Sequence, residues 1–135
     1  TLKGYEGFNE VAEVLDMRKG AELLAQAGVD VIDINMGCAA RKVTGGNSGS
    51  ALMREPDLAK QIIDATLEGA KGKPVTLKMR TGWDREHRNA ITIAKIAEEL
   101  ASTKQGKSSK ARMFVRRFCF LSGVEIQPFF CLAPL

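Results

Sequence analysis

The 135-residue sequence contains few of the residues that build metal and nucleophilic sites: three cysteines and one histidine. Cys38, Cys119 and Cys131 are an odd number with no CxxC spacing, which argues against a disulfide framework or a zinc site. His87, the only histidine, lies in a polar connector, so neither a Ser/His/Asp triad nor a histidine-based metal site is expected. We therefore expect no bound metal, and a protein of the reducing cytoplasm.

Long apolar runs are missing as well. No stretch approaches the roughly 18 apolar residues that span a bilayer. The opening residues also lack the basic start, apolar middle and small-residue cleavage site of a secretory signal. We therefore expect no membrane association. Hydrophobic residues make up 44% of the chain and charged residues 27%, which is typical of a soluble globular protein.

The net charge of +4 is unevenly distributed. Residues 103–135 contain six basic residues against one acid, a net charge of +5, whereas the first 102 residues contain 14 basic and 15 acidic groups, a net charge of −1. The same final segment is rich in phenylalanine. This change predicts a boundary, with an ordered domain over residues 1–101 and a basic tail of uncertain structure over residues 102–135. A basic tail attracts nucleic acid without specifying a binding face.

The first hundred residues alternate helical and strand patterns. We expect helices over residues 10–27, 56–69 and 85–101, and short strands over residues 29–35 and 75–80. This order predicts an α/β fold with parallel strands and crossover helices, in either a doubly wound sheet or a (β/α)8 barrel. A barrel typically needs ~250 residues, so this chain supplies about half of one. No further strand is expected in the tail.

Apolar residues recur at helical spacing in the first helix: Val11, Val14, Leu15, Leu23, Leu24 and Ala27. The strands instead have a period of two. In the first, Asp33 and Asn35 share one face, and the intervening isoleucines share the other. In the second, Lys78 and Arg80 share a face with Thr76.

The end of the first strand carries the first candidate site, Asn35-Met36-Gly37-Cys38. Functional groups of parallel α/β proteins gather where the strands end. A free thiol ordinarily has a pKa of about 8.5, so at neutral pH it is mostly protonated and can donate a proton. The alternative is that Cys38 is a small buried core residue.

Lys78 and Arg80 form a second candidate site, because two cations on one strand face suit an anionic or electron-rich ligand. The alternatives are a solvated face or an ion pair with Asp33. The glycine-rich segment 45–49 has neither the Walker pattern nor GxGxxG, so it is expected to be a connector or a loop that covers a substrate. His87 lies in a polar stretch and is expected to be solvated.

Three collinear segments resemble the tRNA-dihydrouridine synthase family, and its bacterial branch in particular. They read DINMGCAARKV (residues 33–43), GGNSGSALMR (residues 45–54) and VTLKMRTGWD (residues 75–84). Their order and spacing make the resemblance specific over about residues 20–101. It implies an FMN-dependent (β/α)8 barrel that uses NADPH to reduce the C5–C6 double bond of uridine in tRNA.

The resemblance also implies a role for individual residues. Cys38 matches the family's proton donor to C5, while reduced flavin delivers hydride to C6. Asn35 matches the asparagine that contacts the target base, Lys78 matches the lysine that contacts the flavin ring, and Arg80 is expected to face the same pocket and bind substrate. Ala39 stands where the family usually has proline, which loosens the loop without removing the acid.

Two other interpretations remain open at this point. One is a different FMN barrel oxidoreductase acting on a small molecule. The other is a non-catalytic fragment whose basic tail binds RNA nonspecifically, for which steep salt dependence would be the signature. Because half a barrel leaves its inner face open, we expect this chain alone to bind FMN weakly or not at all.

Overall fold

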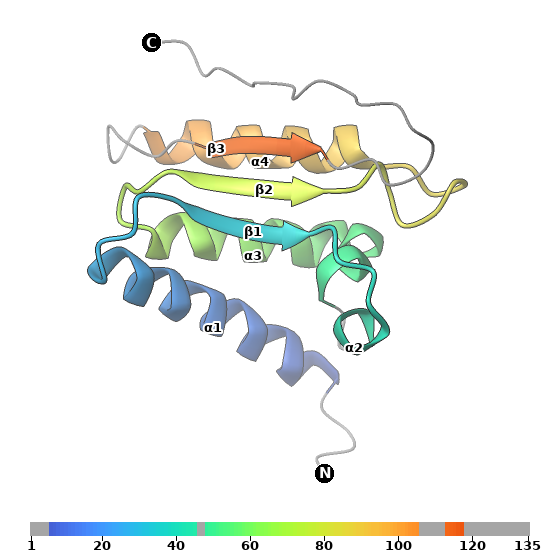
Figure 1. The fold of residues 1–135 in the computed structure, drawn as a ribbon, viewed down its shortest axis with the longest axis horizontal. Coiled ribbons are helices and arrows are strands. Elements are labelled where there is room, and N and C mark those ends of the chain that lie inside the picture. The colour runs from blue at the N-terminus through green and yellow to red at the C-terminus, as the bar shows by residue number, and fades with distance from the viewer. Residues whose placement is uncertain (1–5, 46–47, 106–112, 118–135) are drawn as a thin grey trace.

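We analysed the chain in a computed structural model, which describes residues 6–45, 48–105 and 113–117 (Figure 1). The described elements are α1 (Glu6–Gln26), β1 (Ile32–Met36), α2 (Arg41–Thr44), the 3-10 helix η1 (Gly49–Arg54), α3 (Pro56–Gly69), β2 (Val75–Met79), α4 (Ala90–Gln105) and β3 (Met113–Arg117). The strands form one parallel sheet in the order β1-β2-β3. The predicted α/β fold with parallel strands and crossover helices is confirmed.

The third strand corrects the expectation that the tail contains none. Met113–Arg117 pairs in parallel with β2, and the register places Val75 opposite Met113. The strand reads MFVRR, and two adjacent arginines interrupt the apolar alternation by which a strand is recognised. Pairing with β2 therefore depends on the tertiary fold more than on local pattern. The rest of the predicted tail lies largely outside the described residues.

The core lies between the sheet and the helices. One face of β1 and β2 is apolar and buried, with no residue more than 5% exposed: Ile32, Ile34, Met36, Val75, Leu77 and Met79. In Figure 1, α3 and α4 lie behind the strands. They pack on this face with residues that include Ile62, Ile63, Ile93 and Ala97. These residues recur at helical spacing along each helix, so the apolar stripe of each helix faces the sheet.

The predicted stripe of α1 is wrong in part. Leu15, Leu23 and Leu24 are 49%, 66% and 46% exposed, whereas Ala21 is buried and Met17 packs against the core. The reason is the close crossing of α1 over α3. A Cβ added to Gly69 would overlap the Arg18 carbonyl oxygen and Cβ of Ala21, so α1 lies against α3 at this point through its backbone and Ala21. The three leucines lie on other sides of α1 and remain exposed.

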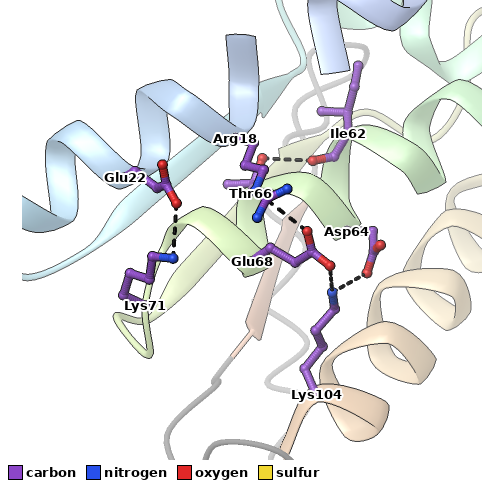
Figure 2. Close-up of polar contacts among 8 residues, drawn as sticks. All are labelled: Arg18, Glu22, Ile62, Asp64, Thr66, Glu68, Lys71 and Lys104. Atoms are coloured by element: carbon purple, nitrogen blue, oxygen red, sulfur yellow. Dashed lines mark hydrogen bonds and ion pairs between the residues drawn. The ribbon is translucent and has the colours of Figure 1, made fainter. Parts of the chain in front are cut away.

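Ion pairs connect the three helices at their exposed edges (Figure 2). The Lys104 ammonium lies 2.9 Å from Asp64 and 2.8 Å from Glu68, which joins α4 to α3. Glu68 also faces Arg18 of α1 at 3.7 Å. Partial desolvation acts to lower the pKa of Lys104, but hydrogen bonds to Glu68 and Asp64 raise this pKa above its ordinary value.

A further pair joins α1 to the turn after α3. The ammonium of Lys71 lies 2.9 Å from a carboxylate oxygen of Glu22, as Figure 2 shows. The hydrogen bond from Lys71 lowers the pKa of Glu22. Both side chains remain substantially exposed, so the pair orients the turn more than it stabilises the fold.

Two elements begin later in the structure than the sequence predicted. The first strand begins at Ile32 instead of residue 29, and α4 begins at Ala90 instead of residue 85. Before α4, the Asp84 carboxylate accepts hydrogen bonds from the backbone N–H groups of Glu86 and His87, which folds this stretch into a turn. The segment between β1 and α3, for which the sequence predicted no helix, contains α2 and η1.

Candidate functional site

The face of the sheet opposite the core carries polar side chains. Asn35 of β1 is exposed and Lys78 of β2 is partly exposed, and the two are register partners. The N–H of Gly37 donates to Oδ1 of Asn35 at 3.0 Å, which fixes the amide at the strand end. Oδ1 of Asn35 accepts this bond, so the NH2 group of the same amide remains available to donate. No described residue accepts a hydrogen bond from it. The structure thus brings Asn35 and Lys78 together, as predicted.

Gly37 leaves the space between these two side chains open. A Cβ at this position would lie 3.6 Å from Cε of Lys78 and 3.7 Å from Oδ1 of Asn35. Any side chain here would therefore extend between the amide and the ammonium. Glycine at the end of β1 keeps this approach free for a ligand atom.

Cys38 follows directly in the loop after β1. It is a free cysteine of intermediate burial and is not among the residues of the apolar core. Its carbonyl oxygen accepts a hydrogen bond of 2.7 Å from the N–H of Ser50, a buried residue of η1. The backbone of Cys38 is thereby held against η1, and the residue as a whole remains partly exposed.

Asp33 does not pair with Lys78 or Arg80, one of the alternatives that the sequence left open. Its carboxylate accepts a hydrogen bond from the Thr76 hydroxyl across β1 and β2. No ion pair of Lys78 or Arg80 occurs within the part of the chain that the structure describes. Arg80 directly follows β2 and is partly buried. The Asp33–Thr76 bond was not predicted, although the period of two places both residues on the polar face.

His87 has the solvated position that the sequence predicted. Its side chain is 76% exposed, and Nδ1 lies 2.7 Å from Oδ1 of Asp84. Partial desolvation acts to raise the pKa of Asp84, but hydrogen bonds from His87 lower this pKa below its ordinary value. This contact belongs to the turn before α4 and is separate from the polar face.

Within residues 6–45, 48–105 and 113–117, no group of three His, Cys, Asp or Glu side chains could hold a metal ion. Among the described helices, none has a stretch long and apolar enough to cross a membrane.

The polar face has the chemistry that a flavin ring requires. An isoalloxazine presents carbonyl oxygens and ring nitrogens at its edge, and gains negative charge on reduction. Lys78 offers a cation and the Asn35 amide offers N–H donors, and the uncrowded backbone at Gly37 separates them. These residues fit FMN. Lys78 would hold the ring, and Asn35 would face the molecule placed against it.

Comparison with known proteins places the chain in a family. The family model for dihydrouridine synthase matches residues 11–103. A probable tRNA-dihydrouridine synthase of Rhodobacter capsulatus is 55% identical over 86 residues, which are 64% of this chain and 26% of that protein.

Two further relatives are both named tRNA-dihydrouridine synthase B. That of Pasteurella multocida is 50% identical over 84 residues, which cover 62% of this chain and 25% of the relative. That of Shewanella oneidensis is 47% identical over 103 residues, which cover 73% and 32%. The chain spans about a quarter to a third of the length of these relatives. The family match covers the two strands whose ends carry the polar residues described above. The chain belongs to the dihydrouridine synthase family.

Proposed function

We propose that this chain forms part of a tRNA-dihydrouridine synthase, in which FMN and NADPH drive reduction of the uridine C5–C6 double bond in tRNA. Its three parallel strands would be consecutive strands of a (β/α)8 barrel, with the polar face of β1 and β2 turned to the barrel interior. The observation that carries the proposal is the pairing of Asn35 with Lys78 at the carboxyl ends of two neighbouring strands, with Cys38 in the loop that follows β1, in a chain that matches the family over residues 11–103.

Cys38 is proposed as the acid that protonates C5 of the uridine. Its support is a free cysteine of intermediate burial, on a loop whose backbone carbonyl accepts a hydrogen bond of 2.7 Å from η1. A positioned acid of this kind typically contributes about 10²–10⁴-fold to a rate. Bound FMN, once reduced, supplies the hydride for C6.

Asn35 and Lys78 are proposed to hold the two reactants against each other. The Asn35 amide has donor groups for the carbonyl edge of a uracil ring, and its orientation is fixed by the N–H of Gly37. The Lys78 ammonium compensates negative charge on the flavin ring. Arg80 would bind substrate phosphate or base from the position just beyond β2. The target uridine must leave its stack to reach them.

The direct test is a chimera, because the chain covers only about a quarter of a relative. Residues 11–103 replace the matching segment of the Pasteurella multocida enzyme. The chimera is then the only dihydrouridine synthase in the cell, and mass spectrometry measures dihydrouridine in its tRNA. We expect the chimera to restore dihydrouridine and its Cys38→Ala variant to lose it.

Flavin absorbance of the purified chimeras provides the control for folding. Equal absorbance with and without Cys38→Ala shows that the loss lies in the chemistry. Undiminished dihydrouridine in the Cys38→Ala chimera would contradict the role of Cys38. Turnover of a small molecule without tRNA would favour another FMN barrel, and salt-dependent RNA binding without dihydrouridine formation would favour a non-catalytic fragment.

A further inference from the structure

Three segments meet at the edge of the sheet where β1 and β2 end: the Cys38 loop, η1, and the stretch of residues 80–89 between β2 and α4. Each contacts the next through a specific hydrogen bond or ring contact. None of these contacts belongs to the polar face that carries Asn35 and Lys78. Together they connect α4 to the backbone of Cys38.

The first contact joins Cys38 to η1. Ser50 donates its N–H to the Cys38 carbonyl at 2.7 Å. Residues Gly49 through Met53 are all buried, and Gly49 has a φ of 61°, a backbone conformation that favours glycine. Because η1 is packed into the core, any shift of this short helix is transmitted to Cys38.

The second contact joins η1 to the start of α4. Nδ2 of Asn89 donates to the Met53 carbonyl at 2.6 Å. Asn89 directly precedes α4, and its own carbonyl accepts from the N–H of Ile93. An asparagine here ordinarily caps the helix through its side-chain oxygen. In the described structure this oxygen is buried without a partner, so the amide serves η1 instead of the helix end.

The third contact is a cation–π pair. The guanidinium carbon of Arg54, the last residue of η1, lies 4.2 Å from the centre of the Trp83 ring. The stretch that presents Trp83 is tightly closed, since the N–H of Trp83 donates to the His87 carbonyl at 3.1 Å. A Cβ at Gly82 would lie 1.9 Å from that carbonyl oxygen, so only glycine fits.

We propose that Asn89 and the Arg54–Trp83 pair are positioning residues that hold η1 and, through Ser50, fix the Cys38 segment at the strand end. The relevance of this placement to uridine reduction rests on the proposed function. The mechanical connection does not, because it can be measured in the chain itself. These residues act on Cys38 through η1, and none of them is proposed to touch a reacting atom.

The test uses the full 135-residue chain with Cys119→Ser and Cys131→Ser, so that Cys38 is the only thiol. Asn89→Asp keeps the size of the side chain and remains a good residue at a helix start, but it places oxygen against the Met53 carbonyl. We expect the Ser50 amide to exchange its hydrogen about tenfold faster than in the parent. Labelling of Cys38 by iodoacetamide should also accelerate severalfold. Amides within α3 and β2 should be unchanged.

Two matched pairs separate positioning from general destabilisation. Arg54→Gln should accelerate Ser50 exchange, whereas Arg85→Gln removes the same charge from an exposed residue of the neighbouring stretch and should not. Trp83→Leu should accelerate it, and Trp83→Phe, which retains an aromatic face, should restore most of the protection. If Asn89→Asp fails to fold, the Arg54 and Trp83 variants with their matched controls decide.

The proposal is overturned if Ser50 exchange stays within about twofold of the parent in Asn89→Asp, Arg54→Gln and Trp83→Leu. It is equally overturned if all amides accelerate together, because the residues would then support the fold as a whole. Neither readout involves FMN, NADPH or tRNA. Failure of the chimera to make dihydrouridine would therefore leave this test intact, and failure here would leave the proposed function standing.

Discussion

The two faces of β1 and β2 differ completely in chemistry although they share the same ten residues of backbone. One face is apolar and at most 5% exposed, and it packs on α3 and α4. The other carries Asp33, Asn35, Thr76 and Lys78, with an inter-strand hydrogen bond and an ammonium that has no ion-pair partner in the described structure. Adjacent residues of one strand thus belong to the core and to the polar face in alternation.

This separation follows from the period of two in a strand. A sheet that packs helices on one face can place any polar residue on the other without a cost to the core. Most parallel sheets are covered on both faces, so a polar open face calls for something to fill it. The closed barrel proposed for the longer protein would provide that covering.

The largest expected effect on the free energy of unfolding comes from substituting, one at a time, two adjacent residues that lie on opposite faces of β2. Leu77→Ala removes a fully buried side chain and should lower the free energy of unfolding by about 3 kcal/mol. Lys78→Met, one residue away, should change it by less than about 0.5 kcal/mol. Urea unfolding of both variants measures the difference. Equal losses would mean that the open face also carries the fold.

The helix-covered side is tested next at the crossing of α1 and α3. A methyl group at Gly69 would collide with the Arg18 carbonyl at 2.2 Å, so Gly69→Ala should destabilise the chain by about 2 kcal/mol. Gly20→Ala is the matched control on α1, where an added Cβ meets nothing within 4 Å. It should stabilise the helix by about 0.5–1 kcal/mol. Thermal unfolding that ranked the two the other way would contradict the crossing.

The smallest effect belongs to the exposed ion pairs. Lys104→Met should cost about 1 kcal/mol, because the ammonium contacts two partly exposed carboxylates. The pKa of Lys104 is raised above its ordinary value of 10.5 in the folded chain. Its contribution is therefore complete below the ordinary pKa and is lost as the pH rises through the folded value.

Unfolding of the parent and of Lys104→Met should thus differ by a constant amount between about pH 7 and pH 9, and converge above about pH 10.5. The comparison is made by urea titration at each pH. A difference that grew with pH would show that the ammonium is not the stabilising form.

The sequence predicted the parts of the fold that repeat a local pattern. The buried faces of β1 and β2 and the apolar stripes of α3 and α4 follow from strand and helix periods alone. It could not predict the side of α1 that faces α3, because that side is set by the close approach of Gly69 to the backbone of α1. It also missed β3, whose two arginines hide the strand pattern and whose pairing depends on β2.

The candidate site and its surroundings also contain residues that local pattern indicates and contacts that only the fold creates. Asn35, Lys78 and Cys38 were found because they occur at strand ends and lie in motifs of a known family. The contacts of Arg54 with Trp83 and of Asn89 with Met53 join residues that are 29 and 36 positions apart. No local spacing indicates such pairs. Only the folded chain brings η1 against the stretch before α4.

The most direct test of the account is a pair of stopped-flow measurements on the chimera that carries residues 11–103, with and without Cys38→Ala. One follows reduction of the bound flavin by NADPH, and the other follows its reoxidation by tRNA. We predict that Cys38→Ala leaves the first rate within about twofold and slows the second by about 10²–10⁴-fold. Equal rates of tRNA-dependent reoxidation in the two proteins would contradict the assignment of chemistry to this strand end.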